Sequence, residues 1–294
     1  MILLDYLRWK KAISGGGISV MNTPETIEYI RRNQCSVCRY GDGEFDLIQG
    51  KRGIGFQENN KNLAARLKHI LEDADKVPHV LVCIPSVLTM RERGELSIDS
   101  ISYWNKYISK FPYSIYRKLY GKRFGDSQIT RPYMRFEKNR KNYENAKKVF
   151  LLLKGLWEYK KVLIVEGRKS RLGVGNDLFS KCITIRRVLC PEANAWSCYN
   201  QILSKVLDIS SEFDLILIAL GPTATVLAYD LGKIGLWAID IGHVDVEYEW
   251  FISKAQRKEP VKNKYVNEVS SVVAEDNDVD DVYRMQIVCE IMRA

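Results

Sequence analysis

Val162-Leu-Ile-Val165 and Leu215-Ile-Leu-Ile-Ala-Leu220 are the two stretches that decide the fold. In each of them every side chain is apolar, which is typical of a strand covered on both faces in the middle of a parallel sheet. Strand and helix patterns alternate around the two runs, and this predicts an α/β fold with a mostly parallel sheet and helices on both faces. We expect strands at 161–166, 182–190, 214–220 and 236–241, and helices at 174–180, 194–209 and 223–234.

The first half of the chain continues this pattern towards the N-terminus. Strands are expected at 36–40 and 79–84, and helices at 23–32, 44–48 and 59–72. From about 99 to 157 the spacing of aromatic side chains predicts a helical insertion. A polar loop at 125–133 interrupts it and is expected to face a ligand cleft.

We expect three parts in the chain: an N-terminal helix with a glycine hinge at 1–21, a main domain at 22–252, and a C-terminal extension at 253–294. The extension is basic over 254–264 and acidic over 275–281, which indicates an exposed, mobile connection in preference to a metal site. Residues 282–292 are expected to add a helix or an edge strand. The first helix is amphipathic, so we expect it to pack on the domain, and a peripheral contact with a membrane surface stays open.

Composition and charge limit the classes of partner. The chain has 294 residues, of which 46% are hydrophobic and 28% charged, as in a globular protein. The net charge of +9 favours acidic partners such as phosphate-bearing ligands. Nucleic acid is disfavoured, because there is no long Lys/Arg tract. The sequence contains no run of about 18 apolar residues, so it predicts no transmembrane helix. The sequence leaves the oligomeric state open.

The seven cysteines indicate a reducing compartment, and we therefore expect a cytoplasmic protein. Their number is odd, and Cys83 and Cys182 stand inside apolar runs. Cys35 and Cys38 form a C-x-x-C pair, but a structural zinc site would need a second pair of ligands. We interpret the pair as buried strand residues, with a zinc or redox role as the less favoured alternative.

Candidate site residues follow the predicted strands, because ligands of open parallel sheets bind outside the carboxyl ends of the strands. Arg39 ends the strand at 36–40, and Gly41-Asp42-Gly43-Glu44 comes next. Two carboxylates in a turn suit Mg²⁺ or Mn²⁺, which keep positions for substrate phosphates. Asp42 and Glu44 are therefore the predicted metal ligands, and Arg39 is expected to contact the phosphates. A D-x-E pattern is weak when it stands alone.

The loop after the strand at 161–166 is a predicted diphosphate cradle. Its glycines let the backbone approach a ligand, and a helix beginning near Val174 would offer free N–H groups. It is neither a P-loop nor a dinucleotide fingerprint, because residue 178 is Leu where the latter needs a third glycine. A glycine-rich turn that only joins strand to helix is the alternative. The expected ligand contacts are Arg168, Ser170, Arg171, Gly173, Gly175, Asn176 and Asp177.

Two further strand ends supply candidates. Gly221-Pro222-Thr223 begins the helix at 223–234, so this terminus is expected to face the ligand, although helix capping alone would explain it. His243, Asp245 and Glu247 follow the strand at 236–241. His243 is expected to meet a metal, a phosphate or the acceptor. For Asp245, a solvated acidic helix face is the alternative.

Four blocks together resemble the GT-D fold glycosyltransferases, a bacterial family that was long catalogued as a domain of unknown function. These blocks are Arg39-Tyr-Gly-Asp-Gly-Glu44, Arg171-Leu-Gly-Val-Gly-Asn-Asp-Leu178, Leu220-Gly-Pro-Thr-Ala-Thr225 and Asp240-Ile-Gly-His-Val-Asp-Val-Glu-Tyr-Glu-Trp250. The resemblance covers residues 22–252 and implies a Rossmann-like sheet with its own topology. It also implies a UDP-sugar donor, often UDP-glucose or UDP-galactose, with Mn²⁺ or Mg²⁺ on Asp42 and Glu44. Members extend glycans on bacterial surface glycoproteins or take part in polysaccharide synthesis.

The function expected from this resemblance is hexose transfer from a UDP-sugar to a glycan or glycopeptide acceptor. The metal and arginines would stabilise the leaving UDP, while a carboxylate base would assist the acceptor hydroxyl if the reaction inverts. Asp240, Asp245 and Glu247 are the candidate bases, and the sequence does not rank them. The alternatives are another nucleotide-dependent transferase and a non-catalytic partner subunit that binds a nucleotide sugar.

Overall fold

The computed structural model describes residues 17–51, 53–89, 93–266, 268–269 and 281–292. The predicted helix over residues 1–16 and the acidic stretch over 275–280 therefore lie outside the described residues.

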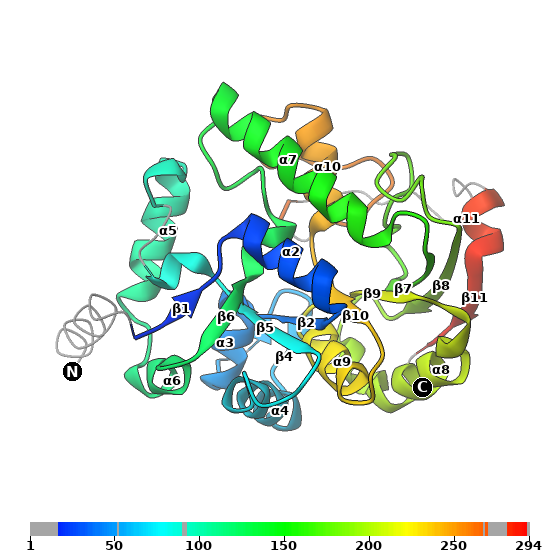
Figure 1. The fold of residues 1–294 in the computed structure, drawn as a ribbon, viewed down its shortest axis with the longest axis horizontal. Coiled ribbons are helices and arrows are strands. Elements are labelled where there is room, and N and C mark those ends of the chain that lie inside the picture. Colours follow the sequence, from blue (N-terminus) through cyan, green and yellow to red (C-terminus); the bar gives the residue numbers. More distant parts are fainter. Residues whose placement is uncertain (1–16, 52, 90–92, 267, 270–280, 293–294) are drawn as a thin grey trace.

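A single nine-stranded sheet forms the centre of the molecule, and every neighbouring pair of strands in it is parallel (Figure 1). The predicted α/β class is therefore confirmed. In spatial order the strands are β1 (Ser19–Val20), β6 (Arg123–Asp126), β5 (Val80–Ile84), β2 (Ser36–Arg39), β10 (Ala238–Asp240), β9 (Leu215–Ala219), β7 (Lys161–Gly167), β8 (Thr184–Cys190) and β11 (Ile287–Glu290).

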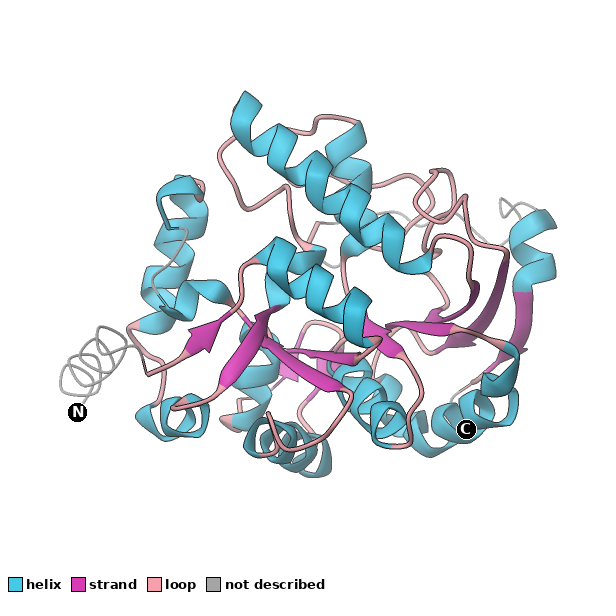
Figure 2. Ribbon diagram, viewed as in Figure 1, coloured by secondary structure: helices cyan, strands magenta, loops and turns pink. Residues whose placement is uncertain are grey.

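Helices cover both faces of the sheet (Figure 2). One face packs against α2 (Thr23–Asn33), α7 (Arg140–Trp157) and α10 (Val244–Ile252). The other packs against α3 (Asp42–Ile48), α4 (Lys61–Glu72), α5 (Ile98–Ile108), α6 (Tyr113–Leu119), α8 (Tyr199–Ile209) and α9 (Pro222–Lys233). A small hairpin of β3 (Gly53–Ile54) and β4 (Gln57–Glu58) follows α3, and α11 (Asp281–Gln286) precedes β11.

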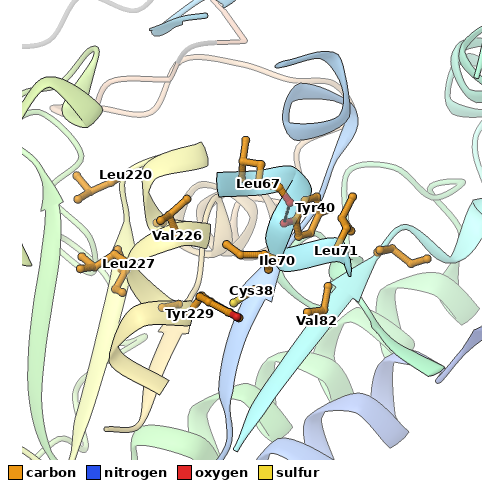
Figure 3. Close-up of a cluster of buried hydrophobic side chains, with 14 of the residues drawn as sticks. Cys38, Tyr40, Leu67, Ile70, Leu71, Val82, Leu220, Val226, Leu227 and Tyr229 are labelled. Carbon is orange, nitrogen blue, oxygen red and sulfur yellow. Dashed lines mark hydrogen bonds between the residues drawn. The ribbon is translucent and has the colours of Figure 1, made fainter. Parts of the chain in front are cut away.

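The strand β2 shows why the central strands read as apolar runs. Cys38 belongs to the core that includes residues of α4 and α9 (Figure 3). Cys35 and Val37 belong to the core on the opposite face, which includes residues of α2. Neither cysteine is more than 2% exposed, so the C-x-x-C pair is core packing, as predicted. Tyr40 belongs to the same core as Cys38, and its hydroxyl donates to the carbonyl of Leu67 at 2.7 Å.

The structure corrects two predicted elements. Residues 99–157 are not purely helical, because they contain β6, which joins the sheet beside β5. The helix predicted at 174–180 is wrong: this stretch is a series of turns. Arg171, Gly173 and Gly175 all have positive φ, at +48°, +76° and +83°, and this backbone cannot continue a right-handed helix.

The C-terminal extension is more closely packed than its polar sequence predicts. Most of residues 252–262 are exposed, as expected for the basic part of the extension, but Lys264 and Val266 are each only 1% exposed and pack into the protein. Residues 281–290 supply both of the expected alternatives, the helix α11 and the edge strand β11. Since β1 also precedes residue 22, the sheet extends beyond both predicted boundaries of the main domain. None of the described helices is long and apolar enough to cross a membrane.

Candidate active site

A large cavity lies where the connections of the sheet diverge. After β2 the chain builds β5 and β6 on one side, whereas β10, the other neighbour of β2, is reached through β7, β8 and β9. Such a switch point leaves a crevice at the carboxyl ends of its two strands. A cavity of about 1050 Å³ opens there, and its wall runs from Arg39 and Asp240 through Gly221 to Gly167, along the ends of four strands.

Asp42 and Glu44 lie in the first turn of α3, at the end of β2, and both line this cavity. Glu44 caps its own helix, since its Oε2 accepts from the backbone N–H of Gly41 at 2.7 Å. Asp42 is held from α5, where the hydroxyl of Tyr103 donates to its Oδ2 and that of Tyr107 donates to its carbonyl at 3.1 Å. One oxygen of each carboxylate is therefore held by a hydrogen bond, and both residues line the cavity.

Burial raises the pKa of Glu44 to about 7, although the N–H of Gly41 works in the opposite direction. A carboxylate with so little water around it gains from a nearby cation. Among the described residues, no group of three or more acidic, His or Cys side chains could hold a metal. An ion on Asp42 and Glu44 would thus take its remaining ligands from water or substrate, as Mg²⁺ commonly does with phosphates. The pair fits such an ion.

Arg39 connects the two strands at the switch point. Its guanidinium donates to the carbonyls of Asp240 and Ser127 at 3.0 and 2.9 Å, and it pairs with the Asp240 carboxylate at 3.4 Å. Gly242 makes room for it, because a Cβ at this residue would lie 1.8 Å from Nη2 of Arg39. Arg39 lines the cavity, and its bonds hold the junction of β2 and β10 together.

The predicted diphosphate loop meets the cavity at only one of its seven residues, Ser170. Arg168 pairs with Glu290 of β11, and Arg171 is 2% exposed. Asn176 donates to Asp245 and Glu249 at 2.8 and 2.6 Å. The loop is thus fastened to α10 and β11 by its own side chains. The members that do not line the cavity are Arg168, Arg171, Gly173, Gly175, Asn176 and Asp177.

Of the residues predicted at the end of β9, only Gly221 lines the cavity, while Pro222 and Thr223 are buried in the first turn of α9. Gly221 has a φ of +55°, and a Cβ here would lie 2.2 Å from the ring of Phe56. The missing side chain lets Phe56, from the turn between β3 and β4, lie against the strand end as part of the cavity wall.

His243, Asp245 and Glu247 surround the start of α10 and all line the cavity. Asp245 accepts from Lys264 Nζ at 2.7 Å and from the N–H of Gly173 at 2.9 Å. Glu247 is 1% exposed and accepts from the N–H groups of Tyr133 and Met134. Burial raises the pKa of Glu247. These bonds give both acids a structural role, and the alternative of a solvated acidic face is wrong because Asp245 is only 3% exposed.

Known proteins resemble this chain over the same region. A model of the family described as "Glycosyltransferase GT-D fold" matches residues 37–269. The chain belongs to this family. Two curated relatives, the probable glycosyl transferase Gly of Streptococcus gordonii and the glycosyltransferase GlyD of Streptococcus pneumoniae, are 37% and 34% identical over 93% and 94% of this chain. The chain spans 39% and 33% of their respective lengths.

Solved structures of the GT-D family agree with this assignment. One, of a highly conserved domain of unknown function 1792 with a distinct glycosyltransferase fold, has a TM-score of 0.88 at 34% identity and covers 99% of this chain and 100% of its own. Another, described as a new glycosyltransferase from Streptococcus sanguinis, has a TM-score of 0.85 at 36% identity, with coverage of 94% and 100%. The resemblance inferred from the four sequence blocks is confirmed.

Several cavity residues of this GT-D protein were missed by sequence reasoning. Tyr103 belongs to the aromatic-rich helical insertion, in which no site residue was predicted, and it is 48% exposed in the cavity wall. Arg131 falls within the polar loop that was expected to face a ligand cleft, and it does line the cavity. Lys258 and Glu268 come from the extension, whose polar composition gave no signal of a site.

Proposed function

We propose that this protein is a metal-dependent glycosyltransferase that transfers a hexose, glucose or galactose, from a UDP-sugar to a glycan or glycopeptide acceptor. We further propose a place for this reaction in bacterial glycoprotein or surface polysaccharide synthesis. The observation that carries the proposal is the pair Asp42 and Glu44 on the wall of a large cavity at the switch point of the sheet. The GT-D family assignment supports sugar transfer as the reaction class.

The shape of the cavity suggests how the donor would lie. The nucleoside would extend along the strand ends towards Gly221 and Gly167, where the ring of Phe56 offers a flat apolar face for a base. The diphosphate would then lie near Asp42 and Glu44. These carboxylates would hold Mn²⁺ or Mg²⁺, whose charge would counter that of the departing diphosphate.

The acceptor would approach from the side of α5, where Ser97, Asp99 and Tyr103 face the cavity. These groups offer donors and acceptors of hydrogen bonds, which suit the hydroxyls of a sugar. Asp240, Asp245 and Glu247 remain candidate bases. Each of them already accepts a hydrogen bond from a backbone N–H group of the protein. A base among them would have to keep this bond while it assists the acceptor hydroxyl.

We also propose that the reaction takes place in the cytoplasm. All seven cysteines are free thiols, and most of them are buried, as expected for a chain kept in a reducing compartment.

Thermal unfolding in the presence of UDP, ATP and S-adenosylmethionine, each with Mn²⁺ and with a chelator, tests the proposal against other transferases. A ligand that binds the native state raises the midpoint of unfolding. We expect a rise with UDP that needs Mn²⁺, and none of comparable size with the other two. A larger rise with ATP or S-adenosylmethionine would contradict the proposal. Slow release of UDP from a UDP-sugar without acceptor would distinguish an enzyme from a non-catalytic partner subunit.

A further inference from the structure

A carboxylate of the protein lies between two positive side chains and close to a histidine inside the cavity. Arg131 approaches Oε1 of Glu268 at 2.7 Å, and Lys258 approaches Oε2 at 2.9 Å. His243 lies 3.9 Å from Oε1. Both oxygens of Glu268 are therefore in contact with cationic groups. We refer to Arg131, His243 and Lys258 as the cation cluster.

The three members of the cation cluster come from separate parts of the fold. Arg131 ends the turn after β6, His243 precedes α10, and Lys258 follows α10. All three line the cavity, as does Glu268 itself. A short-range helix or turn motif does not bring such groups together, so the cluster is a product of the tertiary fold. Its members converge on one anion.

Glu268 behaves as a firmly bound anion. Its side chain is only 18% exposed. Burial alone would raise the pKa of Glu268, but the charges of Arg131 and His243 and the hydrogen bonds from Arg131 and Lys258 lower it to about 2. The carboxylate is thus charged at neutral pH, and it partly neutralises the cation cluster.

One member of the cation cluster, Arg131, lies within electrostatic range of Asp42. The charge of Asp42 acts on Arg131, and the charge of Arg131 acts on Tyr103, which holds Asp42. An anion that reached from Asp42 and Glu44 to the cation cluster would need several acceptor oxygens and more than one negative charge. A diphosphate has both, and arginine and lysine are strong donors to phosphate oxygens.

We propose that the cation cluster is the diphosphate-binding site of the cavity, and that Glu268 occupies this site until the diphosphate of a nucleotide displaces it. The inference rests on the proposed function, and it moves the diphosphate contact away from the glycine-rich loop at 168–177. Because Glu268 competes for the same donors, it lowers the affinity for the nucleotide. The loss of this carboxylate should therefore strengthen binding, whereas the loss of a cation should weaken it.

Binding of UDP with Mn²⁺ and of inorganic pyrophosphate in chelator, both measured by isothermal titration calorimetry, tests this proposal. We expect Glu268→Gln to bind both ligands about threefold to tenfold more tightly, and Lys258→Met to bind both about tenfold more weakly, since each charge-assisted bond contributes on this scale. Glu259→Gln and Lys262→Met are matched controls, because both side chains lie in exposed positions of the same segment and neither lines the cavity. Both controls should bind like the wild type.

Weaker or unchanged binding by Glu268→Gln, with thermal unfolding showing that it is folded, would overturn the displacement. Unchanged binding by Lys258→Met would overturn the assignment of the cation cluster. Pyrophosphate in chelator separates this inference from the proposed function. If the variants shift pyrophosphate binding as expected while no UDP-sugar is turned over, the diphosphate-binding role of the cation cluster is supported and the proposed function is contradicted. If turnover persists while no variant shifts binding, the function stands and the cluster fails.

Discussion

Asp42 and Asp46 stand one turn apart on α3, and their surroundings differ in a way that can be tested. Both accept a hydrogen bond from a tyrosine of α5. Asp46 pairs with Lys51 and does not line the cavity, whereas Asp42 faces it beside Glu44. The two residues thus share a helix and a chemistry, and only one has the position of a metal ligand.

We expect Asp42→Ala to abolish metal-dependent turnover of a UDP-sugar, with a decrease of about a hundredfold or more. The reason is that the metal ion whose positive charge would counter the leaving diphosphate loses a ligand. Asp46→Ala serves as the control and should retain turnover within a fewfold of wild type. Circular dichroism should show both variants to be folded. Normal turnover by Asp42→Ala would rule out its role as a metal ligand.

Glu268 makes the free energy of unfolding depend on pH in the acidic range. Its pKa is lowered from 4.5 to about 2 in the folded protein, so its contribution is complete above about pH 4.5 and is lost as the pH falls towards 2. We expect Glu268→Gln to lower the free energy of unfolding by about 1–3 kcal/mol at pH 7. In urea titrations this difference should shrink between pH 4.5 and 2. A difference that stayed constant over this range would show that the carboxylate is not held by the cation cluster.

At the scale of elements, local sequence predicts structure where packing and propensity agree. The apolar runs of β7 and β9 can only be buried on both faces, and both were predicted to within two residues of their ends. The helix predicted at 174–180 fails because the glycines beside it adopt left-handed backbone, and Asp245 and Glu249 bind the turns from another element. The strand β6 is short and polar at its end, so only its pairing with β5 identifies it.

Gly242 joins β10 to α10 and tests the packing at the switch point. Its φ is +43°, and Gly235, with a φ of +84° and no atom within 4 Å of the position that a Cβ would take, is a control for backbone strain alone. We expect Gly235→Ala to cost about 1 kcal/mol of unfolding free energy. Gly242→Ala should cost about 2–4 kcal/mol in urea titrations, because it also displaces Arg39. If both variants lost the same unfolding free energy, Arg39 would be able to move aside without any loss of stability.

Lys264 fastens the segment after α10 to that helix through Asp245 and Glu249. We expect Lys264→Met to lower the free energy of unfolding by about 3–5 kcal/mol, since it leaves buried acids without their cation. Lys262→Met, two residues away and exposed, should change it by less than about 0.5 kcal/mol. If the two variants were equally stable in urea, Asp245 would not hold this segment in place through Lys264.

At the scale of the whole molecule, the site depends on strand order, which no local pattern encodes. Asp42 and Glu44 follow β2, whereas Asp240 ends β10 and His243 follows it, about 200 residues later in the chain. The two strands are nevertheless neighbours, since Val37 pairs with Ile239. Of the sixteen residues predicted from the rule that ligands bind at strand ends, eight line the cavity. Arg131, Lys258 and Glu268 could not be predicted in the same way, because they reach the cavity from loops.

The central claim is that the cavity binds a UDP-sugar through a metal on Asp42 and Glu44 and releases UDP. Release of UDP from a panel of UDP-sugars, with Mn²⁺ and with a chelator, measures this directly. We predict release from UDP-glucose or UDP-galactose that requires the metal and increases when a glycan acceptor is added. Release that is unaffected by the chelator, or no release from any UDP-sugar with metal and acceptors present, would contradict the claim.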